Sequence, residues 1–514
     1  MAFTIIITNI QYMATRTQFQ HSSHNNKRQL HDARKRERAL LRQRKNFVVN
    51  GLSGLSNMGN TCYMNATLQC LAKVECLLSY LIDDSLFEKE FDMFNRQNIQ
   101  NKLANKLRKD KKLSEDTTVS LYTNDINKAH DITISYSLHK LFKELWIENR
   151  VIAPRSIKDA IAKVPRSIFA GYSQQDSQEV LSLILDTIHE ECKTDAHIDY
   201  TKIPDNVKTL EKYCQDANDY INTLPDGDYK KQYINQVKTY LNSQLELTIL
   251  LKSTKHWQSH LKANGYSFLT ELFGGQILST VTCDKCKIIS PSFDIFMGVI
   301  SVPIPSHGEA TLESCLEKFA VEEHLYGDNK YNCEVCNDKT TATKKLWLYQ
   351  CPPVLIIQLK RFSNDIRGAV SRNGSTVKFP IKNLQLSKNI YYLHDQDPTL
   401  TYDLCAITQH TGSIHGGHYI AYAINPINKL WYRYNDSNIH HIPESDLEKN
   451  LVTDNSYVLY YQKRVQSGVE NDPSDKFSDA PASEDVVESS TENAVDTFIE
   501  EEEVKSIDDI INSC

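Results

Sequence analysis

The sequence predicts an α+β protein, with helices concentrated in its first half and strands in its second. Apolar residues recur at helical spacing after Cys62 and again from Val180 to Ile188. From Phe273 onward, short runs rich in β-branched and aromatic residues are separated by turns, as in QILSTVTC, VLIIQLKRF, HYIAYAI and SYVLYYQ. Helices and strands that occupy separate stretches of a chain are typical of the α+β class.

Charge is distributed unevenly along the chain. The formal net charge of −7 combines a basic start and an acidic end. Residues 1–50 contain ten Lys or Arg and two acidic residues, whereas residues 463–514 contain four Lys or Arg and fifteen acidic residues. We expect a disordered basic arm over 1–50 and a disordered acidic tail over 464–514. The arm can instead be a nuclear-import or nucleic-acid patch, but its basic run RKRERALLRQRK has no aromatic residue to stack on bases. Both segments are candidates for binding adaptor proteins.

The cysteine content indicates a reducing compartment. Thirteen cysteines, an odd number, occur without a secretory signal peptide, so we expect no disulfides. No apolar run approaches the length of a membrane span. These features predict an intracellular protein, in the cytoplasm, the nucleus or both, that does not act on a membrane.

The stretch GLSGLSNMGNTCYMNATLQCL places Cys62 where a helix begins. Glycines and turn-forming residues precede the cysteine, and apolar residues at helical spacing follow it. A thiol in the first turn of a helix lies near unpaired backbone N–H groups and the positive end of the helix dipole, which lower its pKa. The same N–H groups, together with the Asn57 amide, can hold the oxyanion of a tetrahedral intermediate. The alternative is that Cys62 is simply a buried cysteine.

Two CxxC pairs in the strand-rich half predict a metal site. They are Cys283 with Cys286, and Cys333 with Cys336. Each pair can present two thiolates on one side of a turn, and two pairs complete the tetrahedral set that structural zinc prefers. A redox role is the alternative for either pair alone. Four protein ligands leave no position for water, so we expect the zinc to hold structure rather than to catalyse.

The stretch HTGSIHGGHYIAY, which begins at His410, places three histidines ahead of a predicted strand. Either HGGH binds a metal, or one histidine is a general base that Gly416 and Gly417 leave accessible, or the cluster is purely structural. We favour the base, because no acidic third ligand stands at metal-site spacing and a thiol nucleophile is available. The next strand, WYRYND, ends in Asn435 and Asp436, which can accept a hydrogen bond from an imidazole. Cys, His and Asn or Asp together make a thiol-protease triad.

With these motifs in this order, the chain resembles the ubiquitin-specific proteases, a papain-like family of deubiquitinating enzymes. The resemblance runs from about residue 51 to 462 and rests on GLSNMGNTCYMNATLQCL, GYSQQDSQEVLSLIL, CPPVLIIQLKRF, HGGHYIAY with WYRYNDS, and YVLYY. It implies a papain-like cysteine protease fold with a helical thumb, a β palm and zinc-bearing β fingers. The implied catalytic domain covers 51–463, with a polar insertion at about 88–131 and a helical insertion at about 193–262.

The resemblance implies a role for each position of the triad. Cys62 is the nucleophile, His418 is the general base and later the acid, and Asn435 is the third member. Asp436 stands beside it and is able to assist or substitute. Asn57 is the oxyanion donor. The four cysteines bind structural zinc in the fingers, and no catalytic cofactor is implied.

The resemblance also implies which residues bind the substrate. In this family, acidic residues of the second motif engage the arginines of the ubiquitin tail, and the matching residues here are Asp176 and Glu179. A tail ending in Leu-Arg-Gly-Gly needs carboxylates for its cations and a narrow tunnel for its glycines. Gly416, Gly417 and Tyr419, which flank the histidine, are the remaining substrate-binding candidates.

The expected activity is thiol-dependent hydrolysis at ubiquitin's carboxyl terminus, which removes ubiquitin from proteins or chains through a Cys62 acyl-enzyme. Two alternatives are an inactive ubiquitin-binding scaffold and a protease for another ubiquitin-like modifier. Transglutaminase-like acyl transfer also uses Cys, His and Asp, but it does not account for the second motif or the zinc pairs. Ubiquitin and ubiquitinated proteins are the expected partners.

Overall fold

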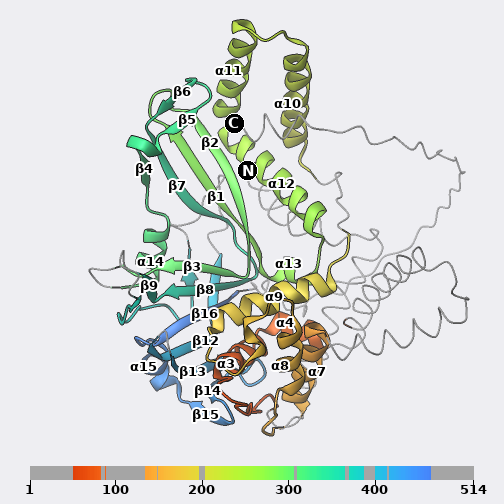
Figure 1. Cartoon of the computed structure of the whole chain (residues 1–514), viewed down its shortest axis with the longest axis vertical. Coiled ribbons are helices and arrows are strands. Elements are labelled where there is room, and N and C mark those ends of the chain that lie inside the picture. The colour runs from red at the N-terminus through yellow and green to blue at the C-terminus, as the bar shows by residue number, and fades with distance from the viewer. Residues whose placement is uncertain are drawn as a thin grey trace, which may run out of the picture.

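The computed structural model describes residues 50–82, 87, 133–147, 149–195, 203–305, 310–364, 370–386, 400–413 and 416–464 (Figure 1). The expected basic arm, the polar insertion at about 88–131 and the acidic tail fall almost wholly outside these residues. The α+β class is confirmed, because nearly all the long helices precede Phe273 and the strands follow it. Within the described part of the chain, no helix is both long and apolar enough to cross a membrane.

The helical thumb surrounds one buried helix. Its members are α3 (Cys62–Leu71), α4 (Glu75–Ile82), α7 (Ile134–Ile147), α8 (Arg155–Lys163) and α9 (Ser177–Cys192). Every residue of α3 is buried, because the helix packs between α9 and the palm sheet (Figure 1). This position carries the start of α3, and with it the candidate nucleophile, against the palm.

The palm is an eight-stranded sheet in the order β15-β14-β13-β12-β16-β8-β3, with β11 paired to β12. All its pairs are antiparallel except β3 with β8. Its strands are β3 (Val299–Pro303), β8 (Val354–Lys360), β11 (Leu384–Gln385), β12 (Thr401–Ser413), β13 (Gly416–Ile424), β14 (Trp431–Asn435), β15 (Asn438–Ile442) and β16 (Ser456–Lys463). Because β13 and β14 are neighbours, the sheet brings the histidine motif beside the Asn-Asp pair.

The fingers are a four-stranded antiparallel sheet in the order β2-β1-β7-β4, which extends away from the palm (Figure 1). The two-stranded β5-β6 hairpin lies at their far end. Their strands are β1 (Gly274–Cys283), β2 (Ile289–Met297), β4 (Glu323–Leu325), β5 (Tyr331–Cys333), β6 (Asp338–Thr340) and β7 (Ala342–Gln350). Shorter elements complete the fold, namely α13 (Phe268–Phe273), α14 (Leu312–Phe319), α15 (Leu447–Leu451), β9 (Phe362–Asn364) and β10 (Val370–Arg372).

Three helices occupy most of the stretch where the sequence predicts a helical insertion. They are α10 (Asp205–Thr223), α11 (Asp228–Ser243) and α12 (Leu245–Asn264). The α10–α11 hairpin stands at the tip of the fingers and shares a small core with α12, which lies along β2 and returns toward the thumb (Figure 1). The insertion therefore braces the fingers.

Candidate active site

The loop before α3 is shaped by the side chain of Asn57. Its Oδ1 accepts hydrogen bonds from the backbone N–H groups of Gly59 and Thr61, both at 3.1 Å. An Asn oxygen that accepts from the backbone N–H groups of residues just after it stabilises a turn of the chain. It turns the chain so that Cys62 is the first residue of the helix, as the sequence predicts.

The thiol of Cys62 differs from the sequence-based expectation in one respect. Burial raises its pKa; the backbone N–H groups of Tyr419 and Tyr63 lower it, and the negative charge of Asp436 raises it further, so the net change is upward. The expected lowering of this pKa is therefore wrong. The residue is only 4% exposed, and the cost of charging a buried thiol exceeds the benefit of the helix N-terminus. Activation of this thiol then requires a neighbouring base.

The candidate base lies on the strand that contacts the thiol. The backbone N–H of Tyr419, the residue after His418, lies near the Cys62 thiol and helps to lower its pKa. His418 Nε2 lies 2.6 Å from Oδ1 of Asn435 on the adjacent strand β14. Since an amide oxygen only accepts, the imidazole donates from Nε2 and keeps its lone pair on Nδ1. The structure records no direct hydrogen bond between the Cys62 thiol and this imidazole.

Asp436 makes a different set of contacts from its neighbour Asn435. Its carboxylate accepts hydrogen bonds from the side-chain amides of Asn57, at 3.0 Å, and Asn65, at 2.8 Å. Its backbone oxygen accepts from Leu55 N at 2.9 Å, and its φ of +50° is one that Asp tolerates. Asp436 thus ties the palm to the loop and helix that carry the candidate nucleophile. The contact with Asn65 was not anticipated from the sequence, since no motif signals it.

The two glycines of the histidine motif are packed very differently. A Cβ on Gly417 would lie 2.3 Å from His410 Nε2 and 2.4 Å from a backbone oxygen, whereas one on Gly416 would meet only the side chain of Gln174, at 3.1 Å. The backbone N–H of Gly417 donates to Gln174 Oε1 at 2.5 Å. Gln174 belongs to the QQDSQE segment, yet sequence reasoning did not single it out. Its bond joins the thumb to the start of β13.

The two acidic residues of the second motif have unequal surroundings. Asp176 caps α9 by accepting from Gln178 N at 2.6 Å, and its other oxygen accepts from the hydroxyl of Tyr457 at 2.6 Å. Burial raises the pKa of Asp176, and these hydrogen bonds oppose the rise. Glu179 is exposed in the first turn of α9 and forms no ion pair with any described residue. Its carboxylate is accessible to an external cation.

The first histidine of the motif is a structural residue. His410 lies inside β12 rather than ahead of a strand, and its ring stacks on Tyr419 with centroids 4.4 Å apart. Burial, together with the charge of Arg372, lowers its pKa to about 4. An imidazole that remains neutral and packed in this way does not act as the base. His415 lies outside the described residues.

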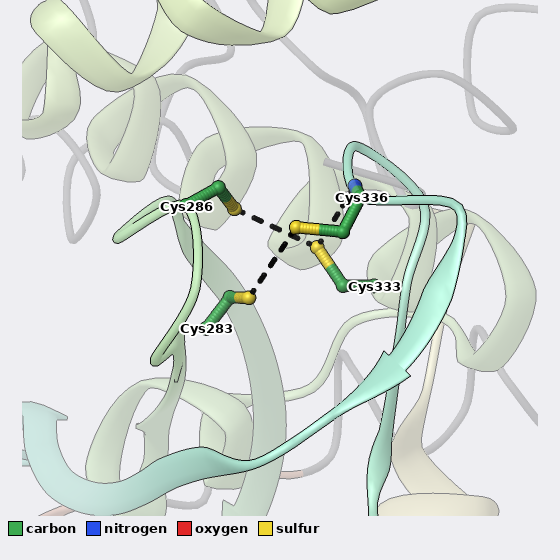
Figure 2. A group of neighbouring side chains, drawn as sticks. All are labelled: Cys283, Cys286, Cys333 and Cys336. Carbon is green, nitrogen blue, oxygen red and sulfur yellow. Dashed lines mark hydrogen bonds between the residues drawn. The ribbon is translucent and has the colours of Figure 1, made fainter.

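The four predicted cysteine ligands come together at the tip of the fingers. Figure 2 shows their sulfurs converging from the turn after β1 and the turn between β5 and β6. All four lie within 4.8 Å of one another, with 3.9 Å between Cys283 and Cys336 and 3.6 Å between Cys286 and Cys333. Four sulfurs held tetrahedrally about 2.3 Å from zinc would be roughly 3.8 Å apart, so the cluster fits that ion. The cluster can hold a metal ion.

Comparison with known proteins identifies the family. The model of the family "UCH: Ubiquitin carboxyl-terminal hydrolase" matches residues 53–461. The chain belongs to this family. Relatives of this ubiquitin carboxyl-terminal hydrolase include a probable ubiquitin carboxyl-terminal hydrolase of Acanthamoeba polyphaga mimivirus, 28% identical over 80% of this chain and 90% of the relative. Ubiquitin carboxyl-terminal hydrolase 2 of Gallus gallus is 30% identical over 82% of this chain and 95% of the relative.

Other relatives are longer. Human ubiquitin carboxyl-terminal hydrolase 2 is 29% identical over 80% of this chain, which spans 55% of that relative. Among solved structures, the Ubp8 SAGA DUB module bound to monoubiquitin has a TM-score of 0.53 at 21% identity, covering 82% of this chain and 72% of that one. This likeness confirms the papain-like α+β fold. The prediction of a deubiquitinating thiol protease is confirmed at the level of the family, and the inactive scaffold is not favoured.

Proposed function

We propose that residues 51–463 of this ubiquitin carboxyl-terminal hydrolase cleave the bond after ubiquitin's terminal glycine through a Cys62 acyl-enzyme. His418 Nδ1 takes the thiol proton, and the sulfur attacks the glycine carbonyl. The C–N bond to the substrate lysine breaks as His418 returns a proton to the departing amine. A water molecule that His418 deprotonates then releases ubiquitin.

The proposal is carried by one observation, the 2.6 Å contact between Asn435 and His418 on the strand whose Tyr419 N–H lies near the Cys62 thiol. The contact orients the imidazole through a neutral amide and leaves Nδ1 as the basic nitrogen. Burial raises the pKa of Cys62, which favours the thiol form and gives the neighbouring base a role in its activation. This supports general-base activation of the thiol by His418.

The oxyanion of the tetrahedral intermediate would be held near the start of α3. The amide nitrogen of Asn57 carries two hydrogens and donates one of them to Asp436 at 3.0 Å. The second hydrogen can serve the oxyanion, and Asp436 fixes the amide for that purpose. In this assignment Asn435 orients the base and Asp436 supports the oxyanion donor.

The tail of the substrate would be recognised by residues of both the thumb and the palm. Glu179 offers an exposed carboxylate for a tail arginine, and Asp176 offers a second, fixed one. The tight packing at Gly417, together with Gly416 and Tyr419, would narrow the path beside His418 so that glycines pass.

Zinc is the metal that the cysteine cluster suits best. Bound by Cys283, Cys286, Cys333 and Cys336, it would stabilise the tip of the fingers, where a ubiquitin globule would be held. Ubiquitin-bound modules among the structural neighbours support ubiquitin as the partner. The terminal segments over 1–50 and 464–514 would carry adaptor binding or a cytoplasmic or nuclear address.

The test is covalent labelling with ubiquitin-vinyl sulfone, read as a gel shift. Wild type and Cys76→Ala, which lacks a different, partly exposed cysteine, should form the adduct, whereas Cys62→Ala should not. An unlabelled wild type, or a labelled Cys62→Ala protein, would overturn the proposal. Parallel probes built on other ubiquitin-like modifiers test whether the enzyme is instead a protease for one of them. Faster labelling by such a probe would identify that modifier, rather than ubiquitin, as the substrate.

A further inference from the structure

A chain of three side-chain hydrogen bonds crosses the palm and ends on Asp176. Ser301 Oγ donates to Gln358 Oε1 at 2.5 Å, Gln358 Nε2 donates to the Tyr457 hydroxyl at 2.8 Å, and that hydroxyl donates to Asp176 Oδ2 at 2.6 Å. The four residues come from β3, β8, β16 and the N-cap of α9. They are referred to below as the relay.

The relay occupies an otherwise apolar part of the sheet. The strand β8 reads VLIIQLK, and the residues around Gln358 are fully buried aliphatic side chains. A polar side chain in such a strand costs free energy unless its hydrogen bonds are satisfied. The parallel register of β3 and β8 places Ser301 directly opposite Gln358, so the first bond is fixed by strand pairing.

The direction of the bonds is also fixed. A carboxylate can only accept, so Tyr457 must donate to Asp176 and must itself accept from the Gln358 amide. Gln358 then presents its oxygen to Ser301. Hydrogen bonds aligned in this way polarise one another and strengthen the last bond, which reaches the charged group.

The relay leaves acceptor positions of Asp176 free. A carboxylate has about four lone-pair sites. The Tyr457 hydroxyl engages one oxygen, and the backbone N–H of Gln178 at the start of α9 engages the other. The helix terminus holds one edge of the carboxylate and the palm holds the other. The group is therefore locked in one orientation.

We propose that Ser301, Gln358 and Tyr457 are positioning residues that hold the Asp176 carboxylate in one orientation for pairing with an arginine of the substrate tail. The inference rests on the proposed function, since it needs a substrate with a cationic tail. It adds to that function a specificity device built from the palm, at a distance from the reacting sulfur. None of the three residues touches the scissile bond in this scheme.

The test compares Tyr457→Phe with Tyr460→Phe on two substrates. Tyr460 lies on the same strand, is fully buried, and its hydroxyl has no hydrogen-bond partner, so its variant controls for removal of a buried hydroxyl. The substrates are ubiquitin-rhodamine with its natural tail and the same protein with the tail arginines replaced by glutamine. Steady-state kinetics give kcat and KM for each pair.

With the natural tail, Tyr457→Phe should raise KM about tenfold and leave kcat within about twofold, because a hydrogen bond to a charged group is lost. With the arginine-free tail, Tyr457→Phe, Tyr460→Phe and wild type should have equal kcat/KM. Gln358→Leu is a second variant, used in case Tyr457→Phe folds poorly. It breaks the relay one bond earlier, and leucine suits an apolar strand. It should show the same changes in KM and kcat as Tyr457→Phe.

Equal losses on both tails would show that Tyr457 has a merely structural role, and no loss on the natural tail would show that the relay is dispensable. Either result overturns the inference while leaving the proposed function intact. Failure of the wild type to cleave the natural substrate would instead refute the proposed function, so the two failures are distinguishable.

Discussion

The amide nitrogen of Asn57 lies 3.0 Å from Oδ2 of Asp436, which joins the loop before α3 to the end of the palm strand β14. The two residues are 379 positions apart in the chain. The bond separates the role of Asp436 from that of its neighbour Asn435, whose oxygen faces His418 instead.

Asp436→Asn tests this division of roles. Asn tolerates the positive φ, but its amide offers one acceptor oxygen where Asn57 and Asn65 need two. We expect kcat to fall about 10- to 100-fold as the oxyanion donor loosens. The charge of Asp436 also raises the pKa of Cys62, so that pKa should fall in the variant. The pH dependence of iodoacetamide alkylation measures the second effect. Full activity, or a thiol pKa that rises, would refute the assignment.

Gly417→Ala should nearly abolish turnover. The new Cβ would lie 2.3 Å from His410 Nε2 and 2.4 Å from the carbonyl oxygen of Thr411, so β13 must shift and carry His418 away from the thiol. We expect a loss of about 100-fold or more in kcat/KM. Gly374→Ala is the matched control, because a Cβ on Gly374 would meet no atom within 4 Å. Comparable activity of the two variants would contradict the packing argument.

Removal of the metal should loosen the helical insertion as well as the fingers. Ile289 N donates to Asn242 at 2.9 Å, and Lys238 pairs with Glu334, so α11 is attached to both cysteine turns. We expect a chelator to increase amide hydrogen exchange in α11 and in the β5–β6 hairpin, but not in α7 of the thumb. Unchanged exchange in α11 would show that the insertion is held independently of the metal.

Lys73 provides a pH-dependent test of the thumb core. It is fully buried, its Nζ has no hydrogen-bond partner, and it lies 4.6 Å from the ring centroid of Trp146. Burial lowers its pKa from 10.5 to about 7. The unfolded chain therefore binds more protons between pH 7 and 10.5, and stability rises with pH across that window.

Lys73→Met removes the free-energy cost of burying a charged ammonium group. We expect the variant to be more stable than wild type at pH 6.5 by up to about 4 kcal/mol, with the difference shrinking toward pH 10. Urea unfolding of both proteins at the two pH values measures it. A difference that does not depend on pH would show that the side chain is not titrating in the fold.

Much of the architecture was predictable from local patterns. The start of α3 at Cys62 depends on neighbouring loop and helix residues, and the strand patterns correspond to β1, β8, β13 and β16. Each CxxC pair follows from the reach of a single turn, whereas the two pairs are joined across 47 and 53 residues by the folding of the fingers. Helix starts, strands and single CxxC turns depend on residues that are close in the sequence, where spacing and turn chemistry carry the information. Parts of the chain such as 88–131 lie outside the described residues, so those predictions stand untested.

The sequence names candidate site residues, but it does not give their contacts. The motifs name Cys62, His418, Asn435 and Asp436, yet they do not say which of the last two faces the imidazole. Successive side chains at the end of a strand point to opposite sides, so the register of β13 against β14 assigns Asn435 to His418. The pKa of Cys62 was predicted in the wrong direction because burial cannot be read from the helix start alone.

The sequence by itself determined the α+β class, the helix that presents Cys62, the two CxxC turns and the family. Only the tertiary structure decided that Asp436 holds Asn57, that Tyr457 holds Asp176 across 281 residues, and that Gln174 holds Gly417. The physical reason is how far apart the interacting residues are in the sequence. Helix starts and single CxxC turns form among neighbours in the chain. The three hydrogen bonds form only after the sheet register and the packing of the thumb on the palm have set the distances.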